Sequence, residues 1–169
     1  KTSAQRLPWL IVLTFLGMIT ATILGSFEET LSQVALLAAF IPIISGMSGN
    51  SGTQSLAVSV RNISTGEIDE RSKFKVALRE AGSGFLSGFV CAVILCLIII
   101  VLYREPILAL IVGGSLTVAM TVGTLVGSII PLIMNKFNID PAVASGPFIT
   151  TINDIVSMLI YFCLLYTSP

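Results

Sequence analysis

The feature that most constrains this chain is a series of five long apolar runs separated by short polar segments. They cover residues 7–26, 31–60, 82–103, 107–134 and 146–166, and together they contain one acidic residue and no Lys or Arg. A helix needs roughly 20 mostly apolar residues to cross a hydrocarbon core about 30 Å thick. Soluble helices of this length usually carry charge on one face. The runs therefore predict an all-α integral membrane protein with five transmembrane helices per subunit.

The overall composition agrees with this interpretation. Of the 169 residues, 54% are hydrophobic and 11% are charged, whereas an ordinary soluble domain has roughly 25% charged residues. Residues 1–169 are expected to form one transmembrane domain, and the opening on Lys1 suggests that this domain belongs to a longer protein. The surrounding lipid bilayer is then its main partner.

The basic residues predict the orientation in the membrane, because Lys and Arg are retained on the cytoplasmic side. One side would hold Lys1, Arg6, Arg61, Arg71, Lys73, Lys75, Arg79 and Lys136, and the other Arg104 with Glu28, Glu29 and Glu105. The N-terminus is therefore expected in the cytoplasm and the C-terminus outside. The charged segment 61–80 is expected to be a solvated connection, or a docking site for a further domain.

One acidic residue, Asp154, lies near the middle of the fifth run. An ionised Asp at the centre of a membrane helix costs about 2.5–3.5 kcal/mol. Asp154 could be protonated and bonded to a neighbouring helix, or it could face water and a cation. Its helical neighbours Thr150, Thr151, Asn153 and Ser157 are polar and favour the second interpretation.

The second run contains the polar, glycine-rich stretch "SGMSGNSGTQS" at residues 45–55. Glycines without side chains can bring backbone carbonyls close to a permeating species or to a partner helix, and exposed backbone at this depth must face protein or water. Helix packing alone would explain the glycines, but it does not require Asn50 and Gln54. A phosphate-binding loop is excluded because Thr53 stands where that motif needs Lys.

Small residues also recur in the third and fourth runs. Gly84 with Gly88, and Gly123 with Gly127, are spaced four apart and predict close helix packing. A stripe of small and hydroxylated residues follows one face of the fourth run, and it could serve packing or line a pore. Its members are Gly114, Thr117, Thr121, Thr124 and Ser128.

Three motifs carry a resemblance to a known family. "RLPWL", "PIISGMSGNSGTQS" and "DPAVASGPFITTINDIVSMLIYF" resemble the membrane domain of MgtE-type magnesium channels, which are related to eukaryotic solute-carrier magnesium transporters. The resemblance covers essentially the whole chain. It departs from the family pattern at Ser48 and Ser157, where the family often has glycine.

The resemblance implies a homodimer in a bacterial or archaeal plasma membrane, with a central pathway where Asp154 binds a largely hydrated Mg²⁺. It also implies cytoplasmic magnesium-sensing domains, which are absent from this chain. The residues expected along the pathway are Gly46, Gly49, Asn50, Gly52, Thr53, Gln54, Thr150, Thr151, Asn153 and Ser157.

The chemistry of these residues suits that implication. Mg²⁺ requires octahedral oxygen ligands and loses water reluctantly, so one Asp per subunit among outer acceptors is a suitable set; Mn²⁺ or Co²⁺ would also suit it. Without His, a second intramembrane acid or a nucleotide loop, the chain is not expected to be an enzyme or to bind nucleic acid. The membrane potential would drive transport. The alternatives are a proton-coupled transporter that titrates Asp154, and a non-transporting assembly domain.

Overall fold

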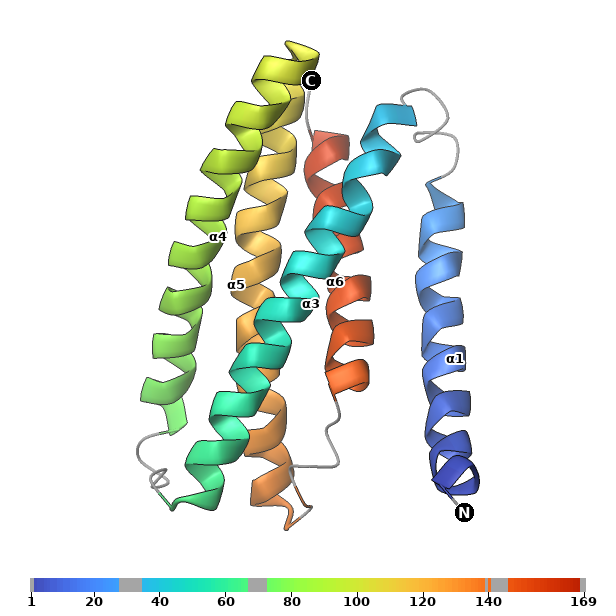
Figure 1. Cartoon of the computed structure of the whole chain (residues 1–169), viewed down its shortest axis with the longest axis vertical. Coiled ribbons are helices and arrows are strands. Elements are labelled where there is room, and N and C mark those ends of the chain that lie inside the picture. The colour runs from blue at the N-terminus through green and yellow to red at the C-terminus, as the bar shows by residue number, and fades with distance from the viewer. Residues whose placement is uncertain (1, 28–34, 67–72, 139, 141–145, 168–169) are drawn as a thin grey trace.

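The chain folds into long helices, as its apolar runs predict. The computed structural model describes residues 2–27, 35–66, 73–138, 140 and 146–167. Within these ranges there are five helices, α1 (Thr2–Ser26), α3 (Ala35–Ser64), α4 (Lys73–Tyr103), α5 (Pro106–Lys136) and α6 (Gly146–Thr167) (Figure 1). Each apolar run lies inside one helix, except that residues 31–34 lie outside the described residues. The predicted all-α fold is confirmed.

Three of the described helices, α4, α5 and α6, are long and apolar enough to cross a membrane, and α1 contains a shorter apolar stretch, Leu10–Ser26. The count of five spans stays a prediction. α3 is less apolar because the stretch 45–55 interrupts its hydrophobic residues, yet it remains one helix through that stretch and past Pro42.

α5 lies at the centre of the bundle and packs against α3, α4 and α6, whereas α1 packs on α6 (Figure 1). The core side chains include Val112, Leu116 and Ala119 of α5, which are at most 1% exposed. α4 instead exposes large apolar side chains such as Phe89 and Leu97. Lipid is as apolar as these side chains, so this outer surface suits a bilayer.

Polar links between helices are also part of the fold. Ser48 Oγ of α3 donates to the backbone oxygen of Ala119 of α5 at 2.8 Å. Ser55 Oγ of α3 lies 2.9 Å from both Thr124 O of α5 and Glu80 Oε2 of α4, so these two acceptors share its one hydroxyl hydrogen. Tyr161 Oη of α6 donates to Leu37 O of α3 at 3.0 Å. Each such bond contributes about 0.6–2 kcal/mol in a membrane. The serines of α3 therefore hold it against α5.

The connection between α4 and α5 is a short turn. Arg104 adopts a positive φ of 58°, which ends α4 at Tyr103. Pro106 then occupies the first turn of α5, a position where its missing N–H and fixed φ are tolerated. The two helices can thus pack side by side in opposite directions.

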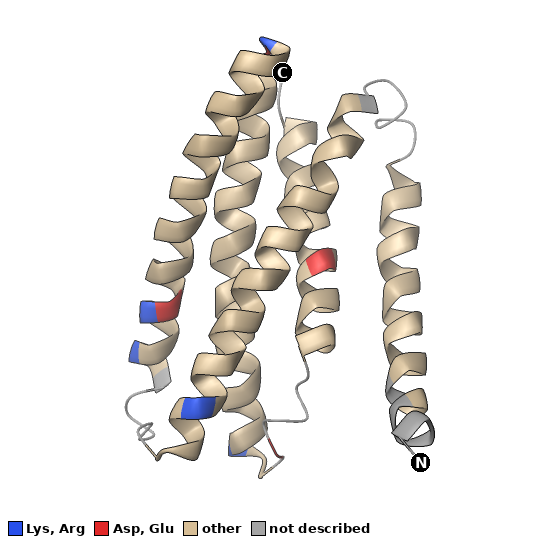
Figure 2. Ribbon diagram, in the orientation of Figure 1, with Lys and Arg blue, Asp and Glu red and all other residues tan. Residues whose placement is uncertain are grey.

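The described basic residues gather at one end of the bundle. Arg61, Lys75, Arg79 and Lys136 lie at the end that also holds the start of α1, and Arg104 lies at the opposite end (Figure 2). Glu28, Glu29 and Arg71 lie outside the described residues. This distribution follows the pattern expected from the sequence, while the orientation of the termini across a membrane stays a prediction.

The expected connection at residues 61–80 is shorter than predicted. Residues 61–64 form the last turn of α3, and residues 73–80 form the first turns of α4. The second part contains Lys, Ala, Leu, Arg and Glu, which have high helix propensity, so the helix extends beyond the apolar run. As a result, Glu80 lies on a helix that packs in the bundle.

Candidate functional site

The acid of the fifth apolar run contacts the polar stretch of α3. Asp154 is the only acidic residue of α6 and lies near mid-height in the bundle (Figure 2). Its side chain is half-buried, and Ser45 Oγ of α3 donates a hydrogen bond to its Oδ1. This contact joins residues 109 positions apart in the sequence. The second carboxylate oxygen of Asp154 is not engaged by that bond.

The polar neighbours of Asp154 divide into two groups. Thr150 Oγ1 and Thr151 Oγ1 donate to carbonyl oxygens of their own helix, at 2.8 Å each from Gly146 O and Pro147 O. Asn153 and Ser157 are buried, at 0% and 1% exposure. In the isolated chain, the hydroxyls of the two threonines are therefore satisfied locally, and Asn153 and Ser157 lie within the helix contacts.

Asn153 ties α6 to α3. Its Nδ2 donates to Ser48 O at 3.3 Å. Its Oδ1 is buried and has no hydrogen-bond partner in the described part of the chain. Close packing explains why the Asn153 side chain is buried, because it lies against Gly52 and Gly123, whose missing side chains make room for its amide.

The glycines of α3 have different surroundings. A Cβ at Gly49 would lie 2.8 Å from Thr150 Cγ2, and one at Gly52 would lie 2.9 Å from Gly123 O. Both glycines thus allow α3 to approach its neighbours. Gly46 is exposed with no atom near such a Cβ, and Thr53 Oγ1 donates to Gly49 O at 2.7 Å.

Asn50 and Gln54 lie on the other flank of α3, away from Ser45. They are exposed at the border of a cavity of about 360 Å³ between α3, α4 and α5. Its polar lining includes Asn50, Gln54, Ser55, Glu80, Ser83 and Ser87. Within one chain, the structure therefore separates the predicted pathway residues into a group around Asp154 and a group around this cavity.

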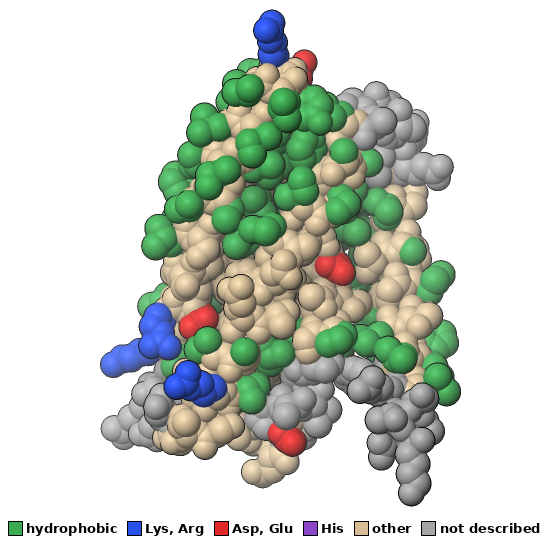
Figure 3. Space-filling model, viewed as in Figure 1, with side chains coloured by type: hydrophobic (Ala, Val, Ile, Leu, Met, Phe, Trp, Pro, Cys, Tyr) green, Lys and Arg blue, Asp and Glu red, His purple; other side chains and the backbone are tan. Residues whose placement is uncertain are grey.

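Figure 3 shows the face on which these groups lie. Polar and backbone atoms extend across its middle below a broad hydrophobic area, with carboxylates on both sides. The acids of α6 and α4 are Asp154 and Glu80. This polar surface at the depth of the apolar helices is the main candidate site of the molecule.

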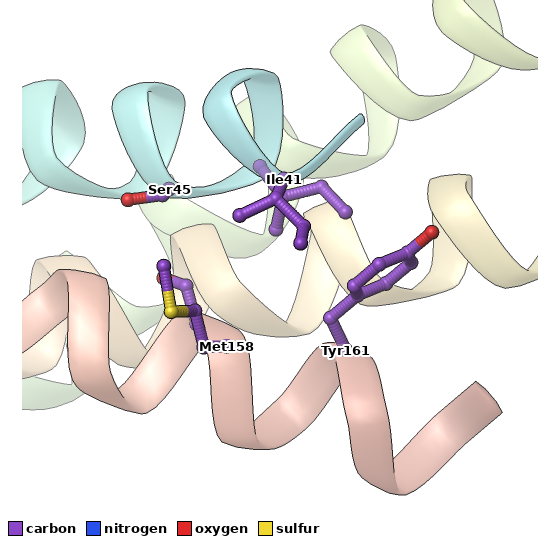
Figure 4. Close-up of a pocket in the computed structure, with 6 residues that line it drawn as sticks. Ile41, Ser45, Met158 and Tyr161 are labelled. Carbon is purple, nitrogen blue, oxygen red and sulfur yellow. The ribbon is translucent and has the colours of Figure 1, made fainter. Parts of the chain in front are cut away.

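A close contact between α3 and α6 lies next to the Ser45–Asp154 bond (Figure 4). Ser45 and Ile41 of α3 face Met158 and Tyr161 of α6 around a small hollow, which has no room for a water molecule. Water is therefore excluded between these helices on the side of Asp154 that leads toward Tyr161.

The four glycines predicted to pack helices all lie at helix contacts. The contacts join Gly84 to Thr124, Gly88 to Thr117, Gly123 to Ser48 and Gly127 to Gly52. The same contacts place part of the hydroxylated stripe of α5 against α4. The backbones of α3, α4 and α5 can thus approach closely around the candidate site.

Sequence reasoning missed two residues of this region, Ser45 and Glu80. Ser45 begins a row of small residues, Ser45, Ser48, Gly52, Ser55 and Ser59, whose spacing of three, four, three and four follows one helix face. That periodicity could have identified the face of α3 that meets α6 and α5. Glu80 was assigned to a loop because its charge lies outside the apolar run.

Apolar helices of membrane-spanning length, with a carboxylate near the middle of one of them, are typical of helical membrane proteins that move ions or other substrates. The profile of the MgtE family, described as divalent cation transporters, matches residues 41–164, and the chain belongs to this family. Its members are transporters, so the expectation that this chain is not an enzyme is confirmed.

Curated relatives with the name magnesium transporter MgtE show the same similarity. The chain is 46% identical to the protein of Bacillus subtilis over 94% of its length, and 43% identical to that of Enterococcus faecalis over 96%. It is 35% identical to the protein of Thermus thermophilus over 92%. The chain spans about a third of the length of these relatives, 34–36%.

Proposed function

We propose that this chain forms the ion pathway of a Mg²⁺ transporter and that Asp154 is its ion-binding group. The observation that carries this proposal is the half-buried carboxylate at mid-height of the bundle, oriented by Ser45. A charge in this position is costly unless water or a cation compensates it. The relatives named magnesium transporters support Mg²⁺ as the cation.

The ligand set suits an ion that keeps most of its water. Mg²⁺ is commonly bound by one or two carboxylates together with several waters. Ser45 donates to one oxygen of Asp154, which fixes the carboxylate and leaves acceptor capacity for a coordinated water or the ion itself. Two Asp154 carboxylates from two subunits would match the charge of one divalent cation.

A homodimer would explain the uncovered polar surface of α3. Asn50 and Gln54 are exposed in the single chain, and polar side chains at membrane depth almost always face protein or a water-filled cavity. A second copy covering this face would remove it from lipid and enclose a hydrated pathway along α3. We therefore place Gly46, Asn50 and Gln54 along the dimer pathway.

The basic end of the bundle gives the proposed orientation, with the N-terminus in the cytoplasm and the C-terminus outside. An inside-negative potential then favours the entry of a divalent cation by about 4.6 kcal/mol per 100 mV. The relatives' greater length leaves room for cytoplasmic magnesium-sensing domains in the full protein. The proposed location is a bacterial or archaeal plasma membrane.

Mg²⁺ uptake into proteoliposomes tests this function. The chain should admit Mg²⁺ when valinomycin and K⁺ impose an inside-negative potential, and the rate should rise with the potential because each ion carries two charges. A protonophore, with the potential clamped, should leave the rate unchanged. Uptake that requires a proton gradient would instead support the proton-coupled alternative, and no uptake above that of empty liposomes would contradict the proposal.

Cross-linking tests the dimer. In a variant without Cys91, Cys96 and Cys163, Gln54→Cys should form an oxidised dimer, since α3 is placed at the interface. Leu97→Cys is the matched control, because Leu97 is 60% exposed on the apolar surface of α4. A monomeric mass in nanodiscs would contradict the homodimer. A dimer cross-linked only through residue 97 would contradict the position of α3.

A further inference from the structure

We infer that the cavity between α3, α4 and α5 is a second cation site, which takes a hydrated divalent ion with Glu80 as its charged group. This cavity lies on the flank of α3 opposite the Ser45–Asp154 contact. The inference goes beyond the proposed function, because it does not require Asp154 to bind an ion.

The size of the cavity suits a hydrated ion. A water molecule needs about 10–15 Å³ of space open to a sphere of its size, and this cavity offers about 360 Å³. A divalent ion together with its six waters therefore has room in it. The ion could therefore enter without losing its hydration shell, which is the costly step for Mg²⁺.

The charge of the cavity favours a cation. Glu80 lines it with a side chain that is 12% exposed, and its Oε2 accepts a hydrogen bond from Ser55 Oγ at 2.9 Å. Arg79 Nη2 lies 3.9 Å from Glu80 Oε1, on a side chain that is 68% exposed. This distance is at the outer limit for an ion pair, and the guanidinium of Arg79 stays largely in water, so the pair contributes little and the negative charge of Glu80 remains available to a bound ion.

The neutral lining supplies acceptors for coordinated waters. Glu80, Ser83 and Ser87 share one face of α4, and Asn50 and Gln54 are one turn apart on α3. The row on α4 is about 10 Å long at 1.5 Å per residue. It leads from the basic end of the bundle toward its middle (Figure 2). A hydrated ion held by Glu80 could exchange hydrogen bonds along this row.

Mn²⁺ binding to the chain in lipid nanodiscs tests the site, with electron paramagnetic resonance of free Mn²⁺ as the measurement. Glu80→Gln keeps an acceptor for Ser55 but removes the charge, and we expect it to lose about one bound Mn²⁺ per chain. Asp154→Asn should retain this Glu80-dependent Mn²⁺, which separates the two sites. Arg79→Gln is the matched control and should also retain it, because it changes the neighbouring charge without touching the carboxylate.

Ser87→Met provides a second test, because it fills the cavity and leaves Glu80 in place. Loss of the same Mn²⁺ in this variant would place the ion inside the cavity. Retention of Mn²⁺ in Ser87→Met but not in Glu80→Gln would place the ion on the surface and overturn the cavity site. An unchanged number of bound Mn²⁺ in a folded Glu80→Gln variant would overturn the inference as a whole. If Glu80→Gln does not fold, the Mn²⁺ count of Ser87→Met alone tests the inference: loss of one Mn²⁺ supports the site, and an unchanged count overturns it.

Discussion

Mg²⁺ flux through the chain is expected to fall at least about tenfold when Asp154 is replaced by Asn. At a separation of about 5 Å, a carboxylate and a divalent ion attract each other by about 1.7 kcal/mol even at the dielectric constant of water. That energy corresponds to more than tenfold in ion occupancy. The measurement is the initial rate of Mg²⁺ uptake into proteoliposomes at a fixed inside-negative potential.

Asn is the appropriate replacement because its Oδ1 can still accept the hydrogen bond from Ser45. Glu105→Gln provides the matched control, since it removes an exposed acid at the opposite end of the bundle from most of the basic residues. The control should keep the native rate. Native flux in a folded Asp154→Asn variant would show that Asp154 is a structural hydrogen-bonding group, and the pathway would then have to be sought around Asn50.

The helices of this chain are largely predictable from sequence, because their apolar runs need only length and composition to be recognised. Their ends are less predictable. α4 begins at Lys73 rather than near residue 82, since good helix formers continue the helix into polar surroundings. The position of α5 at the centre could not be read from hydropathy, because buried and lipid-facing residues are both apolar.

The candidate site was only partly predictable. Asp154 was identifiable because a charge in an apolar run is costly, but its partner Ser45 is far away in the sequence. Asn50 and Gln54 were expected to line the same pathway as Asp154, which stays a prediction. At about 100° per residue they lie about 140° and 180° around α3 from Ser45, and they line the cavity on the other flank.

The glycines of α3 and α5 explain how the group around Asp154 and the cavity lined by Glu80 can lie on the two flanks of one helix. Gly52 meets Gly127, and Gly123 meets Ser48, so the backbones of the two helices approach without intervening side chains. Membrane helices associate largely through such packing and through interhelical hydrogen bonds. The close approach also places the donors Ser48 and Ser55 within reach of α5 carbonyls. The same glycines thus set how closely α3 packs on α5, and with it the positions of the polar residues on both flanks of α3.

Gly127→Ala is therefore expected to destabilise the chain, although Ala normally stabilises a helix by about 1 kcal/mol relative to Gly. A Cβ at Gly127 would lie 2.8 Å from the carbonyl carbon of Gly52 and 3.0 Å from its Cα. Backbone atoms cannot rotate away, so the helices must separate at a cost of about 1–3 kcal/mol. We expect the thermal unfolding midpoint in detergent to fall by a few degrees.

Gly114→Ala is the matched control for this prediction, because Gly114 lies on the same helix and has no atom within 4 Å of an added Cβ. It should keep or raise the midpoint, since only the gain in helix propensity applies. Opposite signs for the two substitutions would locate the effect at the Gly52–Gly127 contact. A midpoint that rises equally in both variants would mean that α3 and α5 are not in backbone contact, and the positions inferred for Ser45 and Asn50 would lose their structural basis.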